Sequence, residues 1–387
     1  MFGEVRLTVV LRFAVMTTVS AADGEKRPAR VGIVGSRGIP NRYGGFERFV
    51  ELLVAHPSWN DRRFRFVVYG ETPPADFNAV TTTRQIGVRK SEKGLQYYAR
   101  GAYLASRECD IVISLGAGIS IFSVIPFVMG KRLIVNPDGA EWKRTKWSPL
   151  GRLAIRSMYY PALFFADRIV IDAEALRTDF PSMFRHKMTY IAYQQVQAPM
   201  VTDDETALSG LGIEAPFMLV IARLEPENNI EMIVDGYLRA APGLPLIVVG
   251  ATTTPFFRDH LEPKQAHNVR FVGAIYDQSV LNALRARCSA YIHGHSVGGT
   301  NPSLLEALAG VKGRLFCHDN KYNREVAGER AQYFADEKQL SALVAATPAG
   351  APDAAAQAVV FDDERYRPSH IAEQYREIFA SLSPGAR

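Results

Sequence analysis

The sequence has few cysteines and no residues spaced like a metal-binding motif. Cys109, Cys288 and Cys317 are the only cysteines in 387 residues, and they lie far apart. This usage does not fit a disulfide framework or a structural zinc site, so we expect buried thiols in a reducing compartment. The chain also has no Asp-x-Asp pair with which to hold a divalent ion. We therefore expect neither a metal nor another cofactor.

Long apolar and long basic runs are also missing. The most apolar stretch, Leu7–Ala22, is interrupted by Arg12 and is too short to span a bilayer. Residues 21–23 loosely resemble the end of a signal peptide. Because a cytoplasmic type of fold follows, we expect residues 1–28 to be a disordered or misassigned extension, with Met16 as an alternative start. The net charge of +5 is mild and unclustered, which suits anionic substrates or an anionic membrane surface and not nucleic acid.

Strands and helices alternate along the chain, which predicts a parallel α/β architecture. A length of 387 residues favours two domains. The first half is expected to contain strands Val31–Gly35, Phe64–Tyr69, Ile111–Ser114, Leu133–Asn136, Arg168–Ile171 and Met188–Ile191 and helices Leu95–Arg107 and Gly151–Phe165. The second half is expected to contain strands Phe217–Ala222, Leu246–Gly250, Val269–Val272, Ala290–His293 and Arg314–Cys317 and helices Ile230–Ala240, Pro302–Ala309 and His370–Leu382.

A polar, irregular stretch marks the expected boundary between the two domains. It runs from Ala192 to Met200 and is followed by three acidic residues, 203–205. The predicted units are an extension over 1–28, a first domain over 29–195, a second domain over 196–368, and a last helix and tail over 369–387. Two such units joined by a linker form a cleft, and ligands bind at the carboxyl ends of the strands.

The most specific pattern is a glycine-rich loop between the first strand and a helix. Gly35, Gly38, Gly44 and Gly45 lie in this loop. Such a turn presents backbone N–H groups and the positive end of the helix dipole to an anion, and Arg37 adds positive charge. The loop therefore suits a phosphorylated or diphosphate ligand. Its glycine spacing does not fit the G-x-G-x-x-G dinucleotide fingerprint, and a tight turn without a ligand is the alternative.

The second half offers a cation and another helix N-terminus. Arg223 follows a strand, so its guanidinium is expected at the cleft, where it can bind a diphosphate through two hydrogen bonds. The alternative is a surface ion pair with Glu225 or Glu227. Further along, a Gly-Gly-Thr-Asn loop precedes a helix that begins near Pro302. We expect this helix N-terminus to face the first one across the cleft.

Carboxylates and histidines flank these two features. Glu306 lies one turn into the second helix and could accept both hydroxyls of a ribose, or could be an exposed helix carboxylate. His293 and His295 lack a third ligand, which argues against a metal site. Asp138 and Glu141 follow a strand of the first domain and could orient a hydroxyl or stabilise positive charge.

The segment from Trp142 to Phe165 mixes aromatic and basic residues. That composition suits an interfacial contact with a membrane, a lid over the cleft, or core packing.

These motifs together resemble a known family. Residues 223–227, 298–306 and 323–325 look like the C-terminal domain of family-4 retaining glycosyltransferases, which have the GT-B fold. Residues 35–47 and 138–144 resemble a subgroup with a rhamnosyltransferase-like N-terminal domain, and the likeness covers about residues 29–382. It implies two Rossmann-like domains that face a cleft, with the last helix crossing back onto the first domain. It also implies sugar transfer from a nucleotide-sugar donor with retained anomeric configuration.

The resemblance implies roles for individual residues. In the family an Arg/Lys pair binds the donor diphosphate; Arg223 matches the arginine, and the lysine position is Asn228. Of the family's two glutamates, Glu306 matches the one that contacts the ribose, and the other position is Gly298. The expected donor-binding residues are Gly44, Gly45, Arg223, Asn228, His295, Gly298, Gly299, Thr300, Asn301 and Glu306, with the missing sugar contact shared by His295, Thr300 or Asn301. Asp138, Glu141 and Arg223 are the expected catalytic residues, and Arg37 and Tyr43 the acceptor-side residues.

The expected enzyme is cytoplasmic and acts in polysaccharide biosynthesis through a front-side, ion-pair-like transfer. Its acceptor would be a glycan or a polyprenyl-linked sugar, which implies peripheral contact with the inner membrane. Rhamnose as the transferred sugar is an analogy with the subgroup. Two other functions stay open: a nucleotide-sugar epimerase of the same architecture and a non-catalytic protein that binds sugar nucleotides.

Overall fold

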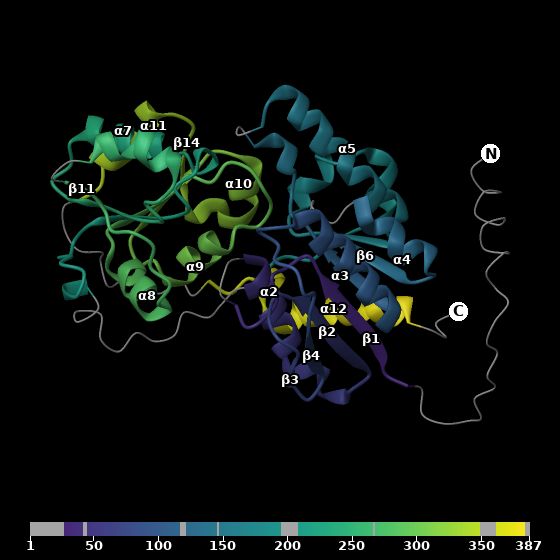
Figure 1. Cartoon of the computed structure of the whole chain (residues 1–387). Helices are drawn as coiled ribbons and strands as arrows, with labels where there is room; N and C mark the ends of the chain where they lie inside the picture. Colours follow the sequence, from purple (N-terminus) through teal and green to yellow (C-terminus); the bar gives the residue numbers. More distant parts are fainter. Residues whose placement is uncertain are drawn as a thin grey trace, which may run out of the picture.

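The chain forms two α/β units that meet along one side (Figure 1). The computed structural model describes residues 27–41, 45–116, 121–144, 147–194, 208–265, 268–348 and 361–383. The predicted extension over residues 1–28 lies almost wholly outside the described residues, as do Tyr43 and Gly44. In the described part of the chain, no helix combines the length and apolarity needed to cross a membrane.

The first unit is built on an eight-stranded sheet with the order β3-β4-β2-β1-β5-β6-β7-β8. Its strands are β1 (Ala29–Val34), β2 (Phe64–Gly70), β3 (Ala75–Asn78), β4 (Thr81–Gln85), β5 (Ile111–Leu115), β6 (Arg132–Asn136), β7 (Arg168–Ile171) and β8 (Met188–Tyr190). All pairings are parallel except that of β3 with β4. The inner strands are apolar on both faces because helices cover both.

Helices on the two faces of this sheet enclose two separate hydrophobic cores. The helices are α2 (Gly45–Ala55), α3 (Gly94–Glu108), α4 (Val124–Val128) and α5 (Pro149–Phe165). Phe49, Val50 and Leu53 of α2 pack on one face, as the helical spacing of the sequence predicts. Helices α3, α4 and α5 cover the other face.

The second unit is built on a six-stranded parallel sheet with the order β11-β10-β9-β12-β13-β14. Its strands are β9 (Met218–Ile221), β10 (Leu246–Val249), β11 (Val269–Phe271), β12 (Ala290–His293), β13 (Arg314–His318) and β14 (Gln332–Phe334). Counted along the unit, this is the doubly wound order 3-2-1-4-5-6, which places the crevice between β9 and β12. One face is covered by α7 (Ile230–Ala240) and α11 (Glu337–Ala345), the other by α8 (Gln278–Arg287), α9 (Pro302–Gly310) and α10 (Lys321–Ala327).

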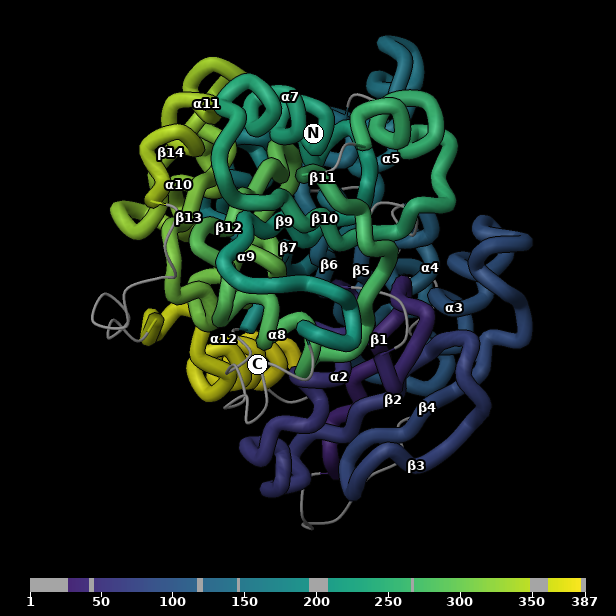
Figure 2. Tube along the Cα trace, turned by 90° about the vertical axis from the view of Figure 1, so that its left-hand side faces the viewer, coloured from purple at the N-terminus to yellow at the C-terminus, as the bar shows by residue number. Residues whose placement is uncertain are grey.

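The last helix, α12 (Pro368–Leu382), belongs to the core of the first unit (Figures 1 and 2). Phe379 is fully buried, and its ring lies 5.5 Å from that of Phe64 and 5.9 Å from that of Trp59. Arg376 forms an ion pair with Asp61. The predicted crossing of the last helix to the first domain is confirmed.

Elements with a weak apolar pattern were missed by the sequence analysis. Strands β3 and β4 consist mostly of polar residues at the sheet edge, and α8 carries polar side chains such as Asn282 and Arg285 on its buried side. Helices α4, α10 and α11 and strand β14 are short. Tertiary contacts therefore decide their structure more than local pattern does.

Candidate functional site

The N-termini of α2 and α9 meet where the two units come together. A Cβ atom placed on Gly45 would lie 3.9 Å from Cγ of Pro302. A small pocket opens beside this contact and is lined by Gly45, Arg48, Phe49, Leu52, Tyr193, Gln194, Pro302 and Glu306. The two helix ends that were predicted to face each other therefore do so. The N-termini of the two helices and the guanidinium of Arg48 bring positive charge to this junction, which favours the binding of an anion.

The loop before α2 is held in place by its neighbours. Gly35 has a φ of +107°, and a Cβ there would overlap the backbone oxygen of Leu115. The backbone N–H of Arg37 donates to Oε1 of Glu47 at 2.7 Å, and the hydroxyl of Tyr97 donates to the backbone oxygen of Ser36 at 2.5 Å. Glycine is thus required for a tight turn, and Glu47 stabilises the loop and is not a free ligand.

Asp138 lies at the carboxyl edge of the first sheet with a φ of +58°. Its backbone N–H donates to Oδ1 of Asn136 at 3.0 Å, and the hydroxyl of Tyr193 lies 3.4 Å from its Oδ1. Burial, with a smaller contribution from the charge of Glu141, raises the pKa of Asp138 to about 6, while Arg144 and Arg223 oppose the shift. Asp138 can therefore exchange a proton near neutral pH, as a general base must.

Arg144 joins the two units by an ion pair on each side. Its guanidinium lies 2.7 Å from Oε2 of Glu141 in the first unit and 2.8 Å from Oε1 of Glu227 in the second. Glu227 is fully buried, so this charge pair is largely removed from water. Glu141 is therefore paired with Arg144, whereas the Asp138 carboxylate lies near the hydroxyl of Tyr193.

Two glycine loops, one from each unit, are in direct contact beside Asp138. A Cβ on Gly139 would lie 3.0 Å from Cα of Gly298. Gly298 itself has a φ of +133°, which residues with side chains rarely adopt. A residue with a side chain at position 298 would therefore have a strained backbone, and its Cβ would lie 3.1 Å from Nε2 of His295.

Asn228 is connected to both Arg223 and His295. Its amide Nδ2 donates to the backbone oxygen of Arg223 at 2.7 Å, and its Oδ1 lies 2.8 Å from Nδ1 of His295. The histidine Nδ1 must then carry the proton, which leaves Nε2 as an acceptor next to Gly298. Burial, followed by the charges of Arg144 and Arg223, lowers the pKa of His295 to about 4, so the ring is neutral at pH 7.

Arg223 is the most exposed of the predicted site residues that the structure places at the cleft. Its side chain is 63% exposed and lies 3.7 Å from Oε1 of Glu225. This weak pair leaves most of the guanidinium open to a ligand. Its charge nevertheless reaches Asp138 and His295, since it lowers the pKa of both groups. Arg223 is therefore near the contact between the two glycine loops.

Glu306 and Asn301 already have partners inside the second unit. Glu306 forms an ion pair with Arg285, a fully buried arginine of α8. Asn301 caps α9 by accepting the N–H of Ser303 at 2.9 Å. The hydroxyl of Thr300 donates to the backbone oxygen of Asp172 in the first unit. Glu306 still lines the pocket and is held at a fixed angle by Arg285, so it is not the loosely exposed carboxylate of the alternative interpretation.

His293 adds no metal site to these residues. It is buried, its Nε2 has no hydrogen-bond partner among the described residues, and burial lowers its pKa to about 3. Across the described part of the chain, no three His, Cys, Asp or Glu side chains are arranged to hold a metal ion. All three cysteines of the sequence are among the described residues, and each is a buried free thiol.

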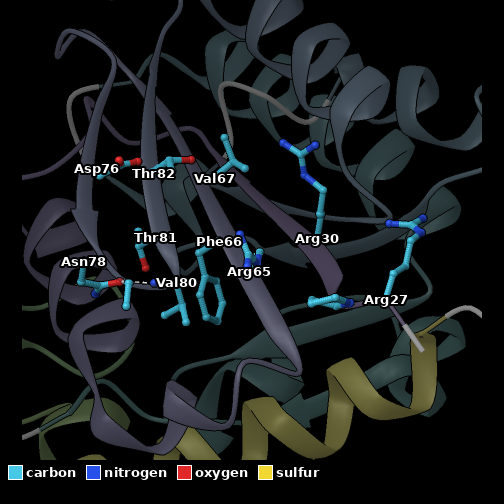
Figure 3. Close-up of a pocket in the computed structure, with 12 residues that line it drawn as sticks. Arg27, Arg30, Arg65, Phe66, Val67, Asp76, Asn78, Val80, Thr81 and Thr82 are labelled. Atoms are coloured by element: carbon cyan, nitrogen blue, oxygen red, sulfur yellow. Dashed lines mark hydrogen bonds between the residues drawn. The ribbon is translucent and has the colours of Figure 1, made fainter. Parts of the chain in front are cut away.

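A larger hollow of about 780 Å³ lies elsewhere on the first unit. It is lined by Arg27, Arg30, Arg65 and residues near the start of β2 and β4 (Figure 3). This is the amino end of the strands, whereas ligands of such sheets bind at the carboxyl end. None of the predicted site residues lines it, so it is not part of the candidate site.

Asp172 and Tyr193 are among the site residues that escaped the sequence analysis. Strands β6 and β7 pair with Val135 opposite Ile169, so Asp138 and Asp172 leave the sheet side by side. The sequence does contain a signal for Asp172, because a carboxylate that directly follows a buried apolar strand lies at the carboxyl edge of the sheet. The sequence analysis applied this reasoning to Asp138 but not to Asp172. Tyr193 lies in the irregular stretch that was interpreted only as a linker.

Comparisons with known proteins agree with this architecture. A family described as "Domain of unknown function (DUF1972)" matches residues 29–77 and 97–195. A search of curated protein sequences finds no match. A solved structure of an α,α-trehalose-phosphate synthase (UDP-forming) from Burkholderia xenovorans in complex with glucose-6-phosphate has a TM-score of 0.69 at 9% identity, covering 92% of this chain and 100% of that one.

A second similar structure is that of Anabaena Alr3699/HepE in complex with UDP and glucose. It has a TM-score of 0.64 at 16% identity and covers 91% of this chain and 100% of that chain. The same protein has been solved in complex with UDP-glucose. At these identities the likeness shows the fold, and the chain has the GT-B fold that the sequence predicted.

Proposed function

We propose that this protein is a glycosyltransferase that moves a sugar from a nucleoside-diphosphate donor to a hydroxyl group of a glycan or lipid-linked acceptor. The observation that carries the proposal is the meeting of two helix N-termini, at Gly45 and Pro302, at the junction of two units with the GT-B fold. Helix N-termini favour anions, and a diphosphate is the anion that such a donor carries.

The donor would lie mainly on the second unit. The exposed guanidinium of Arg223 and the N-terminus of α9 would bind the diphosphate, and the fixed carboxylate of Glu306 would accept the ribose hydroxyls. The solved structures of Alr3699/HepE contain UDP, UDP-glucose or UDP and glucose, which supports a uridine or thymidine diphosphate sugar as the first donor class to test. Rhamnose is the first sugar to test, by analogy with the resembled subgroup.

The sugar contact would differ from that of the resembled family. The second unit has glycine at position 298, so it supplies no carboxylate there. His295 would take over, because its unprotonated Nε2 can accept a hydrogen bond from a sugar hydroxyl beside Gly298. Thr300 and Asn301 would contribute backbone groups, since their side chains already bond Asp172 and Ser303.

The reaction would proceed mainly by electrostatic stabilisation. As the bond between the anomeric carbon and the diphosphate oxygen breaks, its electron pair goes to the diphosphate, whose growing charge Arg223 and the helix N-termini stabilise. The acceptor oxygen bonds to the anomeric carbon on the same face and loses its proton. We assign that proton to the Asp138 carboxylate or to the departing diphosphate, which gives retention without a covalent sugar–enzyme intermediate.

A patch on α5 supports a role at a membrane surface. Leu150, Leu153 and Phe164 are 80%, 63% and 57% exposed, and the exposed Arg152 and Arg156 lie on the same helix. Apolar side chains beside arginines are suited to an anionic lipid surface. The proposal therefore includes peripheral contact with the cytoplasmic face of the inner membrane and a lipid-linked acceptor in polysaccharide biosynthesis.

A donor screen followed by product analysis tests the function. A bound donor raises apparent stability by mass action, by about 2.7 kcal/mol at a hundredfold excess over Kd. Stabilising donors are then incubated with and without a glycan acceptor. Acceptor-dependent release of nucleotide supports the transferase, whereas a free epimerised sugar without acceptor identifies an epimerase. Tight binding without turnover identifies a binding protein, and no stabilisation by any nucleotide sugar contradicts the donor assignment.

A further inference from the structure

Asp172 is a buried carboxyl group at the contact between the two units. It directly follows β7 and is 2% exposed. Its Oδ1 has no hydrogen-bond partner among the described residues. The carboxyl lies against Gly299 of the second unit so closely that a Cβ on Gly299 would overlap Oδ1. A polar group in this position normally has a partner, so its lack of one requires an explanation.

The groups around Asp172 make a negative charge there unfavourable. Asp138 lies beside it on the neighbouring loop, and Glu325 approaches from α10. Tyr193, Tyr322 and Tyr375 face it from the segment after β8, from α10 and from α12, and Thr300 lies in the opposing loop. Among the described residues, the groups that affect the charge of the Asp172 carboxyl most strongly include no lysine, arginine or histidine. Burial first, and Asp138 second, raise the pKa of Asp172 well above its usual range, although the backbone N–H groups of Asp172 itself and of Thr300 act in the opposite direction.

The two units are also in direct contact here, beside the site. The hydroxyl of Thr300 donates to the backbone oxygen of Asp172, and the adjacent Gly298 touches Gly139. If the carboxyl ionises, its desolvation cost falls on the closed arrangement alone, because separation of the loops admits water. A proton on Asp172 therefore favours the closed arrangement over the open one.

We propose that closure of the two units over the site depends on Asp172, whose carboxyl group is buried against Gly299 and favours the closed arrangement when it is uncharged. Loss of the proton separates the loops 138–139 and 298–300. The enzyme would then open as the pH rises. This inference concerns the arrangement of the units and does not depend on what the site binds.

Energy transfer between two dyes measures closure directly. Leu95 and Tyr276 are exposed, one in each unit, and can be changed to cysteine for labelling, while the three native cysteines are buried. We expect transfer efficiency in the otherwise unchanged protein to shift as the pH is raised from mildly acidic to alkaline. Asp172→Asn keeps the shape of the side chain but cannot ionise. The transfer efficiency of this variant should therefore stay, at every pH, at the value that the parent shows at acidic pH. Asp76→Asn, at an exposed edge strand, is the matched control and follows the parent.

Substitutions at the facing glycine provide the second arm. Gly299→Ala places a methyl group on Oδ1 of Asp172 and is expected to show the alkaline value at every pH. Adding Asp172→Ala removes the overlap and restores the acidic value. Gly243→Ala, where a Cβ meets nothing, is the control. A parent without pH response, an Asp172→Asn protein that still responds, or a double variant as open as Gly299→Ala alone would each overturn the proposal.

Discussion

Asn228 fixes the orientation of His295. The asparagine Oδ1 lies 2.8 Å from Nδ1 of the ring, and its Nδ2 is used by the backbone oxygen of Arg223 at 2.7 Å. The position at which the resembled family has a lysine therefore carries no charge but connects two loops of the second unit. Asn228 thus holds the histidine that we assign to the sugar contact beside Gly298.

Replacing Asn228 by alanine should lower kcat/KM without unfolding the protein. The change leaves Nδ1–H of His295 and the backbone oxygen of Arg223 without their partner, at a cost of about 1–3 kcal/mol for each buried group. That cost falls on stability; because the His295 ring also loses the contact that orients it at the proposed sugar site, we expect kcat/KM to fall by about tenfold or more, or about 1.4 kcal/mol. Steady-state kinetics on a folded variant provides the test. Asn78→Ala, which removes a bond to the backbone oxygen of Val54 far from the site, is the control and should keep kcat/KM.

Replacing Arg223 by alanine should lower kcat as well as kcat/KM. Arg223 is exposed here, but a bound diphosphate would desolvate the pair, and truncating one partner of a desolvated charge pair costs about 2–5 kcal/mol, so kcat/KM should fall by tens to thousands. Because the diphosphate gains charge in the transition state, kcat should fall too, and Arg223→Lys should recover only part of the loss. Glu225→Gln breaks the surface pair alone and serves as the control. If Arg223→Ala stays folded and keeps kcat/KM within about threefold of the parent, below 1 kcal/mol, the donor-site assignment is wrong.

The rate should rise with pH as Asp138 ionises. Its pKa is raised to about 6, chiefly by burial, so the carboxyl group is fully ionised, and able to accept a proton, only above that pH. A profile of kcat/KM against pH should therefore climb through about pH 6, up to the higher pH at which ionisation of Asp172 would open the two units. Asp138→Asn should remove the step and most of the activity. An unchanged acidic limb in this variant would assign the proton to the departing diphosphate instead.

Turnover should survive chelation of divalent ions. The sequence has no Asp-x-Asp pair, and the described side chains form no metal cluster. Arg223 and the two helix N-termini would supply the positive charge that a divalent metal ion would otherwise supply. Assays with EDTA, with and without added magnesium or manganese, measure this. Activity that disappears with EDTA and returns with either ion would refute the expectation.

Polar substitutions on α5 should weaken binding to anionic vesicles. Leu150→Ser, Leu153→Ser and Phe164→Ser together remove the exposed apolar surface of the helix, and flotation with vesicles measures the bound fraction. Tyr276→Ser, equally exposed on the second unit, is the control. High salt should release the parent protein, since the arginines contribute by charge. A parent protein that never binds the vesicles would rule out the membrane contact.

The sequence was sufficient to predict the fold because the inner strands are short apolar runs between amphipathic helices. It was insufficient at the sheet edge, where β4 has the sequence Thr-Thr-Thr-Arg-Gln and shows no alternation of apolar and polar residues. The same limit applies to the site. The spacing of Gly45 and Pro302 predicted two helix N-termini, but the closeness of Gly139 to Gly298, or of Arg144 to Glu227, is set by packing between distant segments. Asn228 was interpreted as a missing charge, because its partner His295 is 67 residues away in the sequence.

The position of α12 has a consequence for how the chain is made. Phe379 and Tyr375 complete the aromatic core around Trp59 and Phe49, which lie in the first unit synthesised. That unit cannot close its core on the ribosome until the last helix has emerged, by which time the whole second unit has been translated. A stop codon before Pro368 would therefore damage the domain at the start of the chain, and expression of that domain alone should require α12 to be supplied as a separate or fused segment.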